Sequence, residues 1–191
     1  MNRFHTVRVT PTSHTSAVDD GEIIFIPTEI PNACPRNGTS MLKQIKCYDL
    51  DDNAADIELV FFSNEASMEA IGAAAAKFTF AGGNTTDAIV EAAGPLGGIL
   101  VDVSGGTAGT AVSSQDGVYW EVRDYTANRV YITRNLTFPV NPGNLTSAHT
   151  ETSSAYSIGE TKDSSIYFAG IASATKTYTA AGLVFEFVFE Y

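Results

Sequence analysis

An all-β sandwich, jelly-roll-like, with an extended N-terminal arm and at most one short helix, is the fold class that this sequence predicts. Two observations carry the prediction. Leu183–Tyr191 (LVFEFVFEY) alternates large apolar residues with mixed ones, and a period of two is typical of a β-strand with one buried face. Other short apolar runs recur every 8–12 residues or so, separated by turn residues, as in sandwiches and barrels. The 191-residue chain is 44% hydrophobic, enough for a sizeable core.

The C-terminal strand is expected to close the fold by pairing with Asp56–Ser63 (DIELVFFS), the other dense apolar run. The acidic connection Asp49–Asp56 suggests a hairpin or a neighbouring pair with the strand before it. Glu65–Lys77 has apolar residues near helical spacing and predicts the one short helix, while Gly94–Gly98 predicts a turn. Further strands are expected at Thr39–Asp49, Ile99–Val103, Val118–Val122, Val130–Thr133, Asn135–Val140 and Ser165–Ala172.

Two segments are expected: an extended arm, residues 1–38, and a β-sandwich body, residues 39–191. Pro27, Pro31 and Pro35 follow one another closely in the arm, and each favours extended backbone. The apolar arm residues are therefore predicted to dock on a sheet edge of the same body or of a neighbour. The alternative is that they form ordinary first strands of the sandwich. The predicted contact residues are Phe4, Val7, Val9, Ile23, Ile24, Phe25 and Ile26.

The composition argues against several partners. A formal net charge of −11 with only 11 Lys and Arg residues disfavours nucleic acid, which requires basic groups to displace counterions. No run approaches the length of a membrane span, and the first residues lack the apolar core of a signal peptide. We therefore expect no membrane partner and no secretion. Cys34 and Cys47 are expected to be reduced, packed thiols.

No local motif nominates a catalytic residue, a metal site or a cofactor, and the chain is expected not to be an enzyme. Asp49, Asp51 and Asn53 match the start of a calcium loop, but Ala54 and Val60 occupy the positions that need Gly and Glu. This excludes an EF-hand and leaves a solvated acidic turn as the favoured interpretation, with an opportunistic Ca²⁺ site as the alternative. The three histidines are dispersed. An Asp/Glu pair for glycoside hydrolysis could assemble only from distant strands.

Aromatic residues on adjacent predicted strands offer one further binding hypothesis. Tyr119, Trp120 and Tyr131 could form a platform on which a sugar ring stacks. The more common arrangement is a core tryptophan flanked by tyrosines.

Four segments together resemble small virion structural proteins of tailed bacteriophages. They are an L-V-F-F strand at Leu59–Phe62 after an acidic turn, the strand Ile166–Ala172, a T-x-T-Y-T turn at Thr175–Thr179, and a final aliphatic–aromatic strand, Leu183–Phe189. The resemblance covers about half of the chain, at both ends of the body. The middle, Gly82–Ser154, departs from the pattern.

The resemblance implies a capsid decoration (cement) protein on the outer surface of a phage head, made in the host cytoplasm. Its partners would be the major capsid protein and itself, as a homotrimer at three-fold positions. It would stabilise the shell by bridging capsomers. Two alternatives remain: a tail or neck structural protein, and a carbohydrate-binding β-sandwich module.

Overall fold

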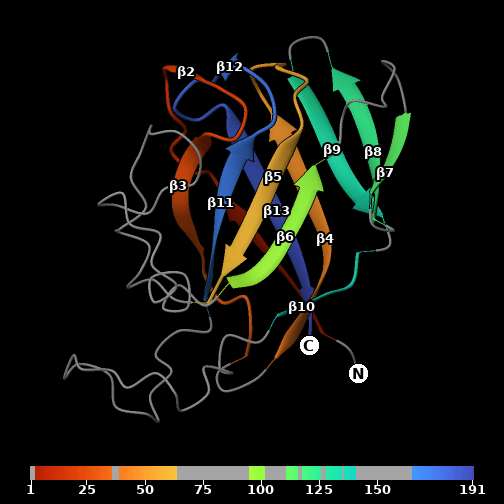
Figure 1. Ribbon diagram of the computed structural model, residues 1–191. Coiled ribbons are helices and arrows are strands. Elements are labelled where there is room, and N and C mark those ends of the chain that lie inside the picture. The colour runs from red at the N-terminus through yellow and green to blue at the C-terminus, as the bar shows by residue number, and fades with distance from the viewer. Residues whose placement is uncertain are drawn as a thin grey trace, which may run out of the picture.

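The computed structural model describes residues 3–35, 39–63, 95–101, 111–115, 118–125, 128–134, 136–140 and 165–191 (Figure 1). These residues form β-strands without a helix and pack as antiparallel sheets, so the predicted all-β sandwich is confirmed. The predicted helix, Glu65–Lys77, lies outside them, as does the arm–body boundary at residue 38.

A seven-stranded sheet forms one layer. Its order is β1 (Phe4–Val9), β13 (Leu183–Glu190), β4 (Ser40–Asp49), β9 (Asn128–Arg134), β8 (Val118–Tyr125) and β7 (Ala111–Gln115), with β10 (Phe138–Val140) also pairing with β4. A four-stranded sheet forms the other layer, in the order β3 (Ile23–Ile30), β11 (Ile166–Ala172), β5 (Ile57–Phe62) and β6 (Pro95–Val101). Two short strands, β2 (Ala17–Val18) and β12 (Lys176–Thr177), pair separately.

The C-terminal strand does not pair with Asp56–Ser63, and that prediction is wrong. Strand β13 lies between β1 and β4, whereas β5 belongs to the other sheet, between β11 and β6. The apolar side chains of β13 and β5 face each other across the core, and the ring centres of Phe61 and Phe187 are 6.2 Å apart. Each strand buries its aromatic side chains against the opposite layer, so both are core strands without being neighbours.

Two predicted turns also differ. The acidic segment after Asp49 does not close a hairpin, because it carries the chain from β4 in one sheet to β5 in the other. Most of Gly94–Gly98 is not a turn, because β6 begins at Pro95 and Gly97 pairs with Phe61. A glycine suits this position, since Gly97 has a φ of 131° that other residues rarely adopt.

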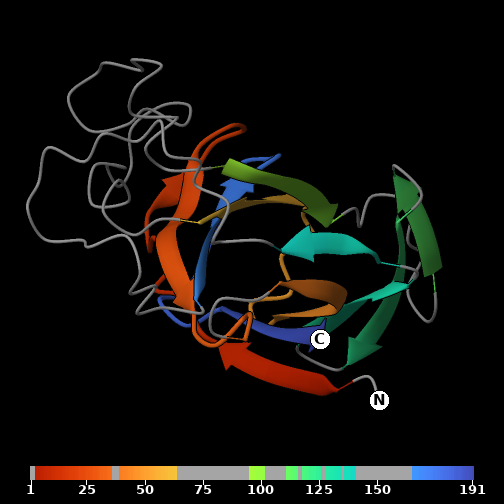
Figure 2. The same cartoon turned by 90° about the horizontal axis from the view of Figure 1, so that it is seen from below.

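Residues 3–35 contribute an outer strand to each sheet. Strand β1 pairs with β13, and β3 pairs with β11, both antiparallel (Figures 1 and 2). Pro27 lies inside β3, which is permitted because an edge strand has one side without ladder partners. Both strands pair at sheet edges of the same chain.

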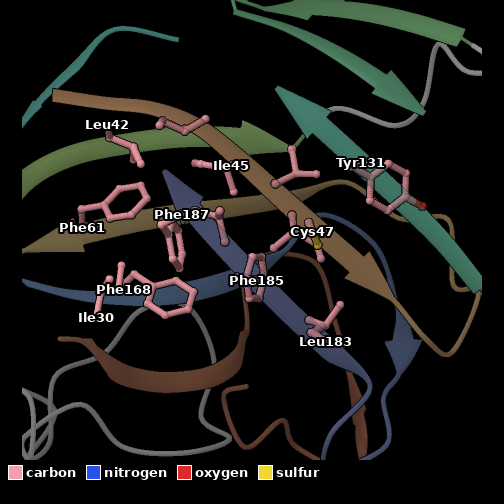
Figure 3. Close-up of a cluster of buried hydrophobic side chains, with 14 of the residues drawn as sticks. Ile30, Leu42, Ile45, Cys47, Phe61, Tyr131, Phe168, Leu183, Phe185 and Phe187 are labelled. Carbon is pink, nitrogen blue, oxygen red and sulfur yellow. The ribbon is translucent and has the colours of Figure 1, made fainter. Parts of the chain in front are cut away.

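Aromatic rings from both sheets fill the centre of the sandwich (Figure 3). The rings of Phe168 and Phe187 meet edge to face at 4.9 Å, and those of Phe25 and Phe168 at 5.2 Å. Such geometry adds to the stabilisation from burial, because the edge of one ring meets the face of the next. The phenylalanines of this core cluster that have no exposed surface are Phe25, Phe61, Phe168, Phe185, Phe187 and Phe189.

Candidate interaction surface

The predicted contact residues divide by burial into two groups. Ile23, Ile24 and Phe25 are completely buried, and Val7 is 7% exposed, so all four belong to the core of the chain. Val9 is partly buried against that core. Only Phe4 (66% exposed) and Ile26 (46% exposed) present apolar side chains to the surface. The burial of Val7, Ile23, Ile24 and Phe25 corrects the predicted contact set, because a partner cannot reach these four side chains in the folded chain.

Phe4 lies at the start of β1, next to the C-terminal residue. Arg3 and Tyr191 exchange two backbone hydrogen bonds, of 2.9 Å from the Arg3 nitrogen and 3.0 Å from the Tyr191 nitrogen. Tyr191 is itself 41% exposed, and its ring lies 6.4 Å from that of His5. Figures 1 and 2 show the two ends of the chain side by side at this edge.

The outer face of β1, β13 and β4 carries a charged row that the sequence did not predict. Arg8 and Lys46 each contact the Glu186 carboxylate at 3.1 Å, from the strands on either side of it. The Arg8 guanidinium also lies 5.3 Å from the centre of the Tyr48 ring. The alternation of the final strand places Glu186 on a polar face, but the cations opposite it could be named only once the pairing was known.

Two cations around one carboxylate change its acidity. Partial burial alone would raise the pKa of Glu186, but Lys46, the Tyr48 hydroxyl and Arg8 together outweigh it and hold the pKa below its ordinary value. Glu186 is therefore charged at neutral pH. With Arg8 and Lys46 both charged, the group retains excess positive charge in a chain that is acidic overall.

The acidic turn after β4 is satisfied internally. Asp49, which is 2% exposed, accepts hydrogen bonds from the backbone nitrogens of Asp51 (3.2 Å) and Ala54 (3.1 Å). Burial raises the pKa of the Asp49 carboxyl, although these backbone donors partly offset the effect. Asp51 is likewise bonded to Thr179. These oxygens stabilise the turn, which is tied to the body instead of being a freely solvated loop.

In the part of the chain that the structure describes, no group of three or more His, Cys, Asp or Glu side chains is placed to hold a metal ion. Nor do those residues include a helix with the length and apolarity needed to cross a membrane. Cys34 and Cys47 are buried free thiols, and burial raises the pKa of both.

The aromatic platform proposed for sugars loses one of its three members. Tyr131 is completely buried, so its ring cannot stack on a ligand at the surface. Strands β8 and β9 do bring Trp120 opposite Thr133 and Tyr119 opposite Arg134. The side chains of Tyr119 and Trp120 are not among those described.

The remaining candidate for an interaction surface is the exposed strand edge that carries Phe4, with an excess of positive charge beside it.

Comparison with family models, curated proteins and solved structures gives no match for this chain.

Proposed function

We propose that this chain is a capsid decoration protein that binds the outside of a tailed-phage head and stabilises the shell by bridging capsomers. Its partners would be the major capsid protein and further copies of itself, as a trimer. Binding to the assembled lattice and not to free subunits would stabilise the shell by mass action.

The strand order is the observation that carries the proposal. If β7–β9, which precede β10 in the same sheet, are set aside, the strands alternate along the chain between the layers in the order β1, β3, β4, β5, β6, β10, β11 and β13, with only β5 and β6 consecutive in one sheet. Sheets of order β1-β13-β4-β10 and β3-β11-β5-β6 are those expected of an eight-stranded jelly roll, with β7–β9 added to one side. Jelly rolls are a recurrent architecture of viral capsid proteins and lectins.

The segments that carry the phage resemblance also contact one another in this fold. Leu59–Phe62 lies in β5 and pairs with Ile166–Ala172, which is β11. The Thr175–Thr179 segment bonds to the acidic turn through Thr179 and Asp51. The resemblance thus falls on one connected set of strands and turns, as expected if it reflects a shared body.

Binding to undecorated heads of the phage that encodes the chain tests the proposal directly. The purified chain should sediment with the heads, saturate at hundreds of copies per particle and raise the temperature at which they rupture. Phe4→Asp, at the exposed edge, should weaken this binding, while Asp20→Asn, at another exposed position, should not. Absence of binding would refute the proposal, and saturation at about a dozen copies would favour the tail or neck.

A further inference from the structure

Among the residues that the structure describes, none pairs with the outer edge of strand β1. It is the last strand of its sheet, so only one of its sides pairs with β13. Arg3 and Tyr191 exchange both of their backbone hydrogen bonds, which makes them a hydrogen-bonded pair of the antiparallel ladder. Because such pairs alternate, His5, Val7 and Val9 also bond to β13. The N–H and C=O groups of the alternate residues, Phe4, Thr6 and Arg8, therefore point away from the sheet.

This edge lacks two of the features that protect edge strands, namely proline and β-bulges. The register of β1 on β13 is continuous from Phe4 to Val9, without a bulge. By contrast, β3 contains Pro27 and has register shifts against β11, and β6 begins at Pro95 with a shift of its own. Proline and bulges discourage a further strand from pairing. Of the long sheet edges, β1 and β7 have neither proline nor a register shift, and β1 is the one of the two whose side chains are described.

Charge indicates what kind of strand fits there. Residues 3–18 contain Arg3 and Arg8 but no Asp or Glu, in a chain of net charge −11. The side chains of Phe4, Thr6 and Arg8 share the exposed face of the strand. The Arg8 side chain is 61% exposed and shares the Glu186 carboxylate with Lys46. A second copy of β1 would bring further arginines to this edge, whereas an acidic strand would bring the opposite charge.

We propose that the outer edge of β1 binds an extended acidic segment of another protein as an added β-strand. Backbone hydrogen bonds would run to Phe4, Thr6 and Arg8. Carboxylates at alternate positions would lie on the face that carries Arg8, because side chains two residues apart share a face. Phe4 would cover an apolar residue of the segment. This proposal adds a binding mode and the chemistry of the partner to the proposed decoration role. It rests on that role only for its biological setting.

Two synthetic peptides test the edge with the full-length chain. One is acetyl-Glu-Val-Glu-Val-Glu-Val-amide, and the other has Lys in place of each Glu. The acidic peptide should shift the amide resonances of Phe4, Thr6 and Arg8 and bind about fivefold or more tightly than the basic one. Its affinity should fall as salt is added, because exposed charges are screened.

Thr6 offers a backbone-specific variant. Its N–H points away from β13, so Thr6→Pro removes an outward donor without removing a ladder bond. Binding should weaken about tenfold, whereas Thr6→Val, which keeps the N–H, should bind as wild type. If Thr6→Pro does not fold, Arg8→Gln provides the second test and should abolish the preference for the acidic peptide.

Several results would overturn the proposal. The proposal fails if no amide resonances shift, if both peptides bind equally, or if Thr6→Pro binds as tightly as Thr6→Val. It also fails if the chain forms a dimer that the Thr6→Pro substitution dissociates but the acidic peptide does not. The peptide measurements contain no particles. If the chain binds phage heads but binds neither peptide, the proposed strand-binding site on β1 is refuted and the decoration role is not.

Discussion

Asp51 holds Thr179 through both of its carboxylate oxygens. The Thr179 backbone nitrogen donates to Asp51 Oδ2 at 2.7 Å, and the Thr179 hydroxyl donates to Oδ1 at 2.9 Å. Two further bonds join the same segments, from the Leu50 nitrogen to the Gly182 carbonyl (2.8 Å) and from the Asn53 amide to the Thr177 carbonyl (2.9 Å). The acidic turn after β4 is thereby fixed to the segment that leads into β13.

Asp51→Ala should destabilise the fold by removing both acceptors. Hydrogen bonds to a charged acceptor typically contribute about 1.5–3 kcal/mol, and exposure lowers this, so we expect a loss of about 1–2 kcal/mol in the free energy of unfolding. Urea denaturation followed by circular dichroism measures it. Asp20→Ala, at an exposed position, should stay within about 0.5 kcal/mol of wild type. Equal losses for the two variants would show that the Asp51 bonds contribute nothing specific.

Gly170→Ala should also destabilise the fold, through a clash in the core. An added Cβ at Gly170 would lie 2.7 Å from Phe25 Cζ and closer still to another atom of that ring. Phe25 is completely buried, so it cannot move aside freely. Overpacking of this kind costs about 1–3 kcal/mol. The denaturation midpoint should fall without a change in slope.

A double-mutant cycle isolates that contact. Phe25→Leu alone should cost stability by leaving space in the core, and it should cost less in the Gly170→Ala background, where the smaller side chain makes room for the new methyl group. Strict additivity of the two losses would contradict the steric explanation.

The strands themselves could be predicted from the sequence, but their partners could not. Thr39–Asp49 and Asp56–Ser63 lie within a residue of β4 and β5, because alternation of apolar and polar side chains identifies a strand and its buried face. The same alternation says nothing about which strand lies alongside. Leu183–Tyr191 and Asp56–Ser63 have equally apolar faces, and only the topology shows that they oppose each other across the core instead of pairing.

The contact surface was harder to predict for the same reason. Phe4 and Phe25 are both phenylalanines in N-terminal strands, yet one is 66% exposed and the other completely buried. Phe25 faces Phe168 of the neighbouring strand and Phe185 of the opposite sheet, whereas Phe4 lies on the outer face of an edge strand. Burial depends on what lies opposite, and residues distant in the sequence determine that.

Phe187→Ala and Phe4→Ala form a matched pair that tests this assignment. Phe187 is completely buried and contacts rings on both sheets, so its loss should cost about 3–5 kcal/mol of the free energy of unfolding. Phe4→Ala removes the same ring from an exposed position and should cost less than about 0.5 kcal/mol. Chemical denaturation of both variants provides the comparison. A large loss for Phe4→Ala would mean that β1 packs differently from the structure described here.

Glu186 should make part of the stability depend on pH. Partial burial raises its pKa, but Lys46, the Tyr48 hydroxyl and Arg8 outweigh that effect, so the folded state has the lower pKa. In acid the unfolded chain therefore binds the proton more readily. The stabilisation is complete above the ordinary carboxyl pKa of about 4.3 and is lost as the pH falls through the lower folded value.

Glu186→Gln removes this titration. The difference in unfolding free energy between wild type and Glu186→Gln should be largest near neutral pH and should shrink as the pH is lowered toward about 3. Lys46→Met, which removes the larger stabilising influence on the carboxylate, should make that difference smaller and less dependent on pH. Urea titrations at several pH values measure both effects. A difference that stays constant with pH would mean that Glu186 has the same pKa in the folded and unfolded chains. The two cations would then have no net effect on the pKa of this carboxyl group.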